Sequence, residues 1–554
     1  MLKKLLVSLL SALLCISVVA EPESQSNENQ NETDVKIDEK GDVFVAPLKY
    51  HISSDSTAEV IKDYSYKKLE SVVIPSEIRV DGHVYLVTSI EMYAFLGCRG
   101  LTSIEIPSGV TSIGYEAFSE CSGLTSINVV TDNAIYSSEN GVLYDKNRTK
   151  LICEPGGKKG KFVVPSGVTR IGDDAFSGCS GLTSIEIPSS VRSIGNEAFK
   201  GCNGLTSIKI PSGVTSIGDG AFEYCRGLTN IEIPSSVRSI GNEAFKGCNG
   251  LTSIKIPSSV TSIGDHAFDR CSGLTSIKIP SSVRSIGEGA FWGCDGLTSI
   301  KIPSSVRSIG KRAFWGCDGL TSIKIPSGVT SIGAHAFDGC SGLTSIKIPS
   351  SVRSIGKGAF LGCIDLTNIK IPGVTSIGDY TFYGCRELRN ITIPSSVRSI
   401  GNEAFMGCSG LTSIKIPSGV TIIGDGAFYE CRGLTNIEIP SSVTSIGNYI
   451  FYECSGLSRV KIPSNVTSIG ENAFSGCREL TNIDIPSSVT SIGNYAFSNC
   501  VGLTSIEIPS SVTSIGKKAF YGCENLEIVI DNSKENVIVE ENAFDGCKSV
   551  KFLK

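Results

Sequence analysis

Several residue types and motifs that enzymes and metalloproteins need are scarce in this chain. It holds four histidines, three methionines and two tryptophans in 554 residues. We find no G-x-S-x-G nucleophile motif, no H-E-x-x-H zinc motif, no phosphate-binding loop and no G-x-G-x-x-G in a strand–helix context. No C-x-x-C pair occurs and the histidines are scattered, which argues against a zinc site. The sequence therefore predicts a protein that is not an enzyme and that uses no cofactor and no metal.

An excess of one charge sign is also missing. The chain has 50 Lys+Arg against 55 Asp+Glu, so its formal net charge is -5. Such a balance does not favour nucleic acid as a partner, because nucleic-acid-binding proteins usually carry a large positive excess.

Long apolar runs are absent after residue 20. In the first twenty residues, MLKKLLVSLLSALLCISVVA, two lysines precede an apolar run that ends in small residues. This pattern is typical of a secretory signal peptide over residues 1–20, and it is too short to span a membrane comfortably. Cys15 leaves a lipid anchor open as an alternative. We therefore expect a secreted or cell-surface protein, attached to a membrane only through an anchor that the sequence does not show.

Residues 21–42 begin with the polar, acidic stretch EPESQSNENQNETD, which has no aliphatic or aromatic residues. Such a stretch cannot bury enough apolar surface to offset the entropy of ordering. We predict a flexible acidic linker over this range.

Most of the remaining chain repeats one motif of 23 residues, L-x-x-I-x-I-P-S-x-V-x-S-I-G-x-x-A-F-x-x-C-x-x, numbered here from its leucine. F-x-x-C occurs nineteen times, from Phe95–Cys98 to Phe544–Cys547. Positions 4 and 6 are apolar and alternate with polar positions 3 and 5, which predicts a short strand with one buried face. Proline at position 7 ends the strand, because it has no N–H to donate.

The second half of the motif predicts a return to the core. Valine at position 10 and isoleucine at position 13 indicate a second short inward segment, and x-x-A-F-x-x-C indicates a helical or 3₁₀ turn. One such unit cannot bury its apolar edge alone, whereas stacked units can. We therefore predict an α/β repeat solenoid, a leucine-rich-repeat arc of short parallel strands with about 19 rungs.

The motif I-P-S-x-V-x-S-I-G-x-x-A-F-x-G-C resembles the BspA-like (treponemal-type) leucine-rich repeats of bacterial and protist surface proteins. The resemblance covers residues 69–547, with an inserted β-hairpin over 128–161. A β-hairpin over 43–68 and a last strand over 548–554 are expected to cap the two ends, because open strand edges need cover.

Nineteen of the 21 cysteines lie at position 21 of the repeat. Cysteines at a single position of the repeat favour a ladder of buried thiols, since free cysteine packs as a small apolar residue. Bridges between neighbouring rungs remain the alternative, if their Cβ atoms converge.

Two rows of variable positions are candidate binding surfaces. Position 5, expected on a basic inner face of the arc, is lysine in six successive rungs: Lys255, Lys278, Lys301, Lys324, Lys347 and Lys370. An anionic ligand would offset the repulsion within this row, but the central copies are nearly identical, so duplication is the favoured explanation.

Position 19, expected on the outer turn, carries most of the aromatic candidates: Trp292, Trp315, Tyr383, Tyr429 and Tyr452. Exposed aromatic rows are typical of protein contacts. The alternative is that these rings lie flat between turns and extend the core.

The resemblance implies adhesion to extracellular host or matrix proteins such as fibronectin or fibrinogen. Two other hypotheses remain open, a glycan-binding surface module that would use the aromatic row and a passive structural spacer.

Overall fold

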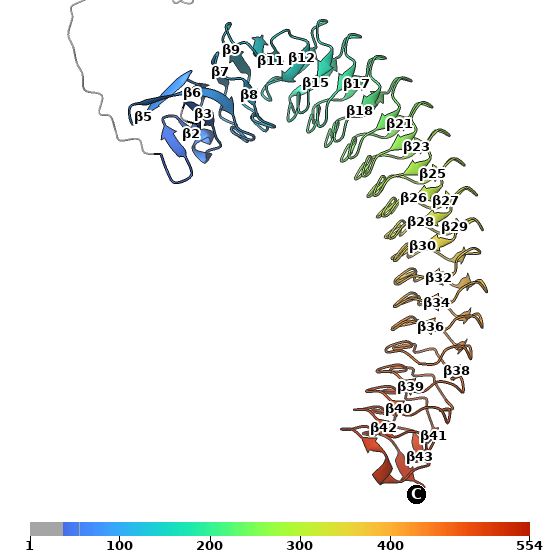
Figure 1. The fold of residues 1–554 in the computed structure, drawn as a ribbon. Helices are drawn as coiled ribbons and strands as arrows, with labels where there is room; N and C mark the ends of the chain where they lie inside the picture. The colour runs from blue at the N-terminus through green and yellow to red at the C-terminus, as the bar shows by residue number, and fades with distance from the viewer. Residues whose placement is uncertain (1–36, 55) are drawn as a thin grey trace, which may run out of the picture.

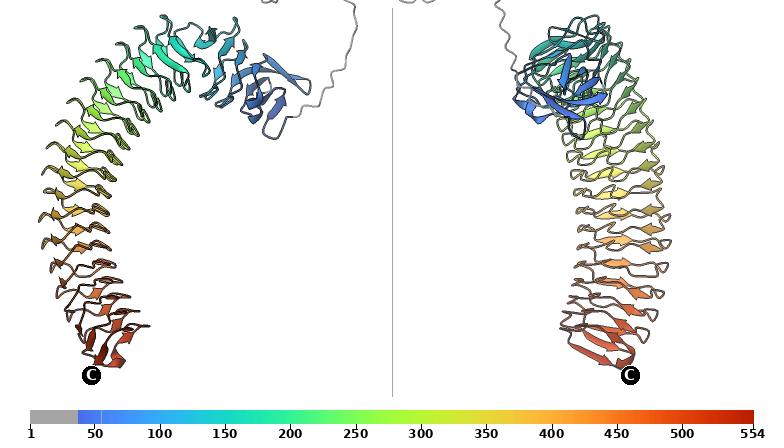
Figure 2. Two further views of the ribbon diagram at one scale, coloured as in Figure 1. Left: turned by 180° about the vertical axis from the view of Figure 1, so that it is seen from behind. Right: turned by 60° about the vertical axis from the view of Figure 1, so that its left-hand side comes forward.

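Residues 37–54 and 56–554 are described by a computed structural model, in which stacked coils form an arc (Figure 1). Two further views show the same single curved stack from behind and from the side (Figure 2). The predicted signal peptide and residues 21–36 of the predicted linker lie outside the described residues. No helix within the described ranges is long and apolar enough to cross a membrane.

Most coils contribute one strand to each of two parallel series. The first series covers the middle of the L-x-x-I-x-I segment: β4 (Ser71–Val73), β7 (Ser103–Ile106), β9 (Ser126–Val129), β13 (Gly160–Val163), β15 (Leu182–Glu186), β17 (Ser207–Lys209), β19 (Asn230–Glu232), β21 (Ser253–Lys255), β23 (Ser276–Lys278), β25 (Ser299–Lys301), β27 (Ser322–Lys324), β29 (Ser345–Lys347), β31 (Asn368–Lys370), β33 (Asn390–Thr392), β35 (Ser413–Lys415), β37 (Asn436–Glu438), β38 (Arg459–Lys461), β41 (Ser505–Ile508), β43 (Glu527–Ile530) and β45 (Ser549–Phe552).

The second series covers positions 12 and 13 in most coils: β8 (Ser112–Ile113), β12 (Lys150–Cys153), β14 (Arg170–Ile171), β16 (Ser193–Ile194), β18 (Ser216–Ile217), β20 (Ser239–Ile240), β22 (Ser262–Ile263), β24 (Ser285–Ile286), β26 (Ser308–Ile309), β28 (Ser331–Ile332), β30 (Ser354–Ile355), β32 (Ser376–Ile377), β34 (Ser399–Ile400), β36 (Ile422–Ile423), β39 (Ser468–Ile469), β40 (Ser491–Ile492), β42 (Ser514–Ile515) and β44 (Ile538–Val539). Within both series, equivalent residues of successive coils pair in register, as Ile300 does with Ile323.

The turn over positions 14 to 20 forms a third ladder and is not a helix. Its N–H groups alternate: Phe291 donates to Ala313 O of the next coil at 2.8 Å, whereas Trp292 donates back to Gly289 O at 3.0 Å. Because every second N–H group donates to a carbonyl group of the neighbouring coil, a continuous helix cannot form. The only helices in the described part of the chain are the 3₁₀ segments η1 (Tyr64–Lys68) and η2 (Lys534–Asn536). The solenoid of about twenty stacked coils is confirmed, but the α/β label is not.

The phenylalanines and cysteines of the turns line the interior. Neighbouring rings stack along the array, for example Phe291 on Phe314 with centroids 5.4 Å apart. Most buried thiols donate to the phenylalanine carbonyl of the preceding coil, as Cys317 Sγ does to Phe291 O at 3.0 Å. The twenty cysteines of the described chain are free thiols, and all but Cys153 and Cys547 are buried. The buried-thiol prediction is therefore confirmed.

The array begins with a mixed sheet in the order β1-β2-β3-β6-β5. Its strands are β1 (Asp42–Val45), β2 (Leu48–Ser54), β3 (Thr57–Val60), β5 (Glu77–Val80) and β6 (His83–Ile90). β1, β2 and β3 pair antiparallel, while β3 pairs parallel with β6, whose last residues pair with β8 of the next coil. At the other end, β45 pairs parallel with β43.

The insertion interrupts the apolar core. β10 (Tyr136–Glu139), β11 (Val142–Asp145) and β12 form an antiparallel meander that joins the array where β12 pairs parallel with β14. The buried apolar residues accordingly fall into two clusters, one reaching from Val43 to Leu143 and the other from Val142 to Ala543. The core that the coils share is therefore continuous on each side of the insertion.

The turns lie on the inner side of the arc. In Figure 1 β25 and β27 lie toward the outer side, and β26 and β28 toward the inner side. Shallow hollows open between coils along positions 4 to 9, as around Glu186, Lys209 and Glu232. The proline at position 7 has no N–H to donate to the next coil, so the coils spread on this side. On the other side, three N–H groups per coil donate to the next coil and draw the turns together. The arrangement of the two candidate rows is thus the reverse of the expectation: the lysine row lies on the outer side.

Candidate functional site

The six lysines of position 5 form one continuous row on the first strand series. They are direct cross-strand neighbours from β21 to β31, because each pairs in register with the next. All six side chains are exposed. Within the described residues, none of the six makes an ion pair. The structure therefore brings together a single-sign row without local neutralisation.

Outside this row, position 5 carries charges of both signs. Lys415 pairs in register with Glu438, which pairs in turn with Lys461. On the N-terminal side, Lys209 lies 3.5 Å from Glu232. The six-lysine row is thus a local departure from a mixed pattern on the same face.

Arginines of position 11 differ from these lysines in their contacts. Arg307 Nη1 donates to Ser304 O at 2.9 Å, and Arg398 Nη1 donates to Ser395 O at 2.9 Å. These guanidinium groups fold back on the loop of their own coil. They hold that loop, whereas the six lysines are exposed.

The aromatic row of position 19 lies on the inner side, and its rings pack on one another. Trp292 and Trp315 stack with centroids 4.5 Å apart and planes 11° from parallel, and Tyr429 and Tyr452 stack at 4.6 Å. The guanidinium of Arg312 covers Trp315 at 4.8 Å from its centroid. All five candidate aromatic residues, including Tyr383, are half-buried. The row is a packed strip with little free ring face.

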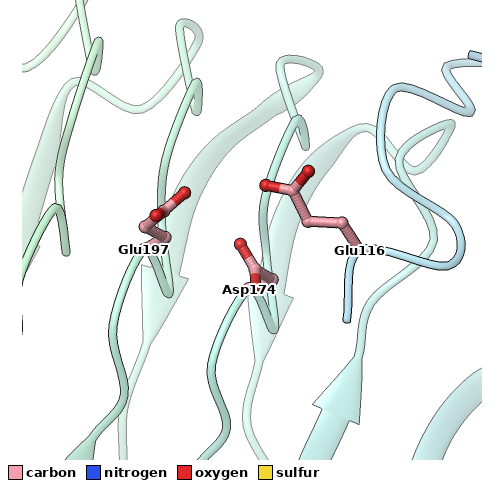
Figure 3. A group of neighbouring side chains, drawn as sticks. All are labelled: Glu116, Asp174 and Glu197. Atoms are coloured by element: carbon pink, nitrogen blue, oxygen red, sulfur yellow. The ribbon is translucent and has the colours of Figure 1, made fainter. Parts of the chain in front are cut away.

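A group of three carboxyl groups lies on the inner side beside the insertion. Glu116, Asp174 and Glu197 each hold position 16 of a turn, and one carboxyl oxygen from each lies within 4.8 Å of the other two. Figure 3 shows the three side chains converging from separate turns. All three residues have left-handed backbones, with φ of 50°, 53° and 53°. This strained conformation costs roughly 1–2 kcal/mol per residue and is fixed by the bonding to the next turn.

Lys200 is the basic residue that contacts this group. Its ammonium pairs with Glu197, lies 3.9 Å from Glu116 and lies 3.5 Å from Glu223. Both carboxyl oxygens of Asp174 are enclosed and find no hydrogen-bond partner in the described chain. One carboxyl of the three is therefore left without compensation.

Glu154 takes the place of a core phenylalanine in the same region. Its N–H donates to Ala175 O at 2.7 Å, and Cys179 Sγ donates to its carbonyl at 3.3 Å; both bonds belong to phenylalanine elsewhere in the array. Glu154 is only 2% exposed, and neither of its carboxyl oxygens has a hydrogen-bond partner among the described residues. The ladder thus buries a bare carboxyl group where it normally buries a ring.

Glu154, Glu116 and Asp174 line one cavity of about 290 Å³, together with Tyr115 and Lys150. Burial raises the pKa of Glu154 to about 7, and burial with the charges of Glu116 and Glu197 raises the pKa of Asp174 to about 7. The pKa of Glu116 is also raised, mainly by burial. The cavity therefore holds acidic groups that are costly to ionise in the absence of a positive partner.

Sequence reasoning missed this group. Glu116 and Asp174 share position 16, but the insertion lies between them, and nothing in residues 128–161 marks Glu154 as the equivalent of a phenylalanine. An alignment of the turns by their position 16 residues would have placed the three acids in one column.

The described residues define a class of protein, a leucine-rich-repeat solenoid built from stacked 23-residue coils. A family model described as BspA type leucine rich repeat region matches residues 59–155, 158–275, 261–386, 375–500 and 467–554. The chain therefore belongs to the BspA-type leucine-rich-repeat family.

Solved leucine-rich-repeat structures to which this chain is similar come from several bacteria. A leucine-rich repeat protein from Bacteroides ovatus is 29% identical, with 84% of this chain and 94% of that chain covered and a TM-score of 0.42. A leucine rich cell surface protein from Faecalibacterium prausnitzii is 32% identical over 76% of this chain and 94% of that chain, with a TM-score of 0.36. A leucine rich repeat protein of T. pallidum is 36% identical over 29% of this chain and 78% of that chain, with a TM-score of 0.28. A search of the curated proteins finds no match.

Proposed function

We propose that this chain is an exported surface protein that binds an acidic protein partner through the six-lysine row and carries out no catalysis. One observation carries the proposal: six exposed lysines stand in register on adjacent strands with no ion pair to any described residue. By family resemblance, the expected partners are extracellular host or matrix proteins of the fibronectin or fibrinogen kind.

The energetics of the row favour an anionic partner. Adjacent parallel strands lie about 4.8 Å apart. Unit charges at that distance repel by roughly 1 kcal/mol in water before screening by salt. A run of carboxylates on a partner would relieve this repulsion along the whole row. Because the side chains are exposed, the attraction would mainly accelerate association and would weaken with added salt.

Duplication of neighbouring coils also accounts for repeated lysines, but it does not account for the pattern on either side. The flanking coils copy the same core and the same loops but carry charges of both signs at position 5, as with Lys415, Glu438 and Lys461. The proposal predicts that binding depends on the continuous lysine row and not on the mixed charges of the flanking coils.

Glycan binding at the aromatic row is the second candidate function. Sugar rings stack on free aromatic faces, and here Trp292 and Trp315 cover each other while Arg312 covers Trp315. The packing favours a role in stability for these rings. A passive spacer is the remaining alternative, and it predicts no specific ligand.

Binding to immobilised fibronectin and fibrinogen, measured by surface plasmon resonance at several salt concentrations, tests the proposal. The triple variant Lys278→Glu, Lys301→Glu, Lys324→Glu should lose binding, mainly through a slower association rate. The matched control is the double variant Lys415→Glu, Lys461→Glu, which changes the same repeat position outside the row and should bind as the parent does.

Equal affinity of the triple variant and the parent would contradict the proposal, and so would binding that does not weaken as salt is added. A glycan-array signal that disappears in Trp292→Ala would favour the glycan-binding alternative. Absence of any ligand in both experiments would favour the spacer.

A further inference from the structure

We propose that Glu116, Asp174 and Glu197 bind a hard divalent cation of the calcium type at the mouth of the cavity beside the insertion. This site is distinct from the lysine row, since it lies on the inner side of the arc and near the N-terminal end of the array. Its success or failure is therefore independent of the function proposed above.

The geometry of the three acids suits one ion. Calcium binds carboxylate oxygens at about 2.3–2.6 Å, so two oxygens on opposite sides of one ion lie roughly 4.6–5.2 Å apart. One oxygen each of Glu116, Asp174 and Glu197 lies within 4.8 Å of the other two, which allows all three residues to contact the same cation. Carboxylate ligands with no sulfur or imidazole among them are the set that calcium and magnesium prefer.

The position of the acids is fixed by backbone bonds. Asp174 N donates to Asn196 O at 3.0 Å, and Glu197 N donates to Asp219 O at 2.8 Å, so successive turns hold both residues in register. The left-handed φ at each position turns the side chains toward the same strip of surface. A cation would thus meet a largely preformed set of ligands.

A second and independent observation points to a cation at this place. Glu154 is buried at the position of a ladder phenylalanine, lines the same cavity as Glu116 and Asp174, and has no hydrogen-bond partner in the described ranges for either oxygen. A bare buried carboxylate costs several kcal/mol unless a positive charge compensates it. No chemistry of the repeat requires an acid here, since the equivalent residue in other coils is apolar.

Positive side chains near the site do not complete it. Lys200 pairs with Glu197 and lies within reach of Glu116 and Glu223, but Asp174 is left unpaired. Lys150 lines the cavity, as does the acidic Asp173. The acids around the cavity and its mouth therefore outnumber the amines.

The test uses the full chain, stripped of metal, and calcium chloride as the titrant in isothermal calorimetry. Tb³⁺ serves as a second probe because Tyr115 lies at the cavity and can sensitise its emission. Asp174→Asn preserves the shape of the side chain and should weaken calcium binding by about tenfold or more, since affinity depends on the charge of the ligand set. Tyr115→Phe should reduce Tb³⁺ emission.

Glu243→Gln is the matched control, because Glu243 also holds position 16 with a left-handed φ of 53° but pairs with Lys246 outside the group. It should bind calcium as the parent does. Calcium should raise the unfolding temperature of the parent and of Glu243→Gln, but not that of Asp174→Asn. The proposal is wrong if the parent binds neither ion at millimolar concentration, if Asp174→Asn binds as tightly as the parent, or if Glu243→Gln weakens binding equally.

Discussion

The replacement of one ladder phenylalanine should loosen its own coil and the coils beside it. Phe314 is fully buried and stacks on Phe291 at 5.4 Å and on Phe337 at 5.3 Å. Phe314→Ala removes the ring from both interfaces. Truncations of this kind cost about 3–5 kcal/mol in a packed core. Because each coil contacts only its neighbours, we expect the loss to be concentrated in residues 291–342.

Hydrogen exchange measured by mass spectrometry gives this loss coil by coil. A loss of about 3 kcal/mol corresponds to roughly a hundredfold or greater fall in protection, since each 1.4 kcal/mol is a factor of ten. Coils well removed from the site should keep their protection. Phe44→Ala is the control, because Phe44 is 50% exposed and should cost little. A fall in protection spread evenly over the array, or one smaller than about tenfold near Phe314, would refute the reasoning.

Three other predictions follow from the packing and the charges. All described cysteines except Cys153 and Cys547 are buried, so a disulfide reagent should label these two first and the others only on unfolding; rapid labelling of the whole ladder in the native protein would contradict this. Gly287→Ala should destabilise the array by about 1–3 kcal/mol in denaturant unfolding, because the new Cβ would lie 2.7 Å from Gly264 O. The control Gly167→Ala should be nearly neutral, because a Cβ at Gly167 would have no atom within 4 Å. In cation-free protein, the pKa values of Asp174 and Glu154 are raised to about 7, so the folded state holds more protons than the unfolded state. The free energy of unfolding should therefore fall as pH rises from about 4 to about 7, by at most roughly 1.4 kcal/mol per pH unit for each group. Asp174→Asn should reduce this slope, and an unchanged slope would count against the burial of the Asp174 carboxyl group.

The regular part of the fold could be predicted from residue pattern alone. Alternation in L-x-x-I-x-I indicates a strand with one buried face, and a cysteine at a single phase indicates a thiol ladder. Both follow from local periodicity and from the need of each unit for neighbours, which the sequence displays directly.

The turn conformation could not be predicted in the same way. The stretch around Ala290 and Phe291 has the composition of a helical turn, but half of its N–H groups bond to the next coil. That choice depends on a partner that is distant in sequence by one full repeat. The direction of curvature likewise depends on which side of the coil is drawn together, and it reversed the expected inner and outer positions of the two candidate rows.

The acidic group depends on the insertion, where the repeat pattern stops being informative. Glu116 and Asp174 meet only because the meander replaces one turn of the ladder, and Glu154 enters the core from outside the repeat motif. The lysine row, in contrast, was visible in the sequence, since it needs nothing beyond equal spacing. Its role as a binding surface stays a prediction.

The central claim is that each 23-residue unit is stable only through the interior that it shares with the units on either side. Deletion of one whole unit, residues 297–319, compared with deletion of half a unit, residues 303–313, tests this claim most directly by circular dichroism and hydrogen exchange. The account predicts that the first deletion leaves a folded array with Phe291 stacked on Phe337 and a modest loss of stability, while the second breaks the register and unfolds the neighbouring coils. Equal tolerance of the two deletions, or unfolding by both, would contradict it.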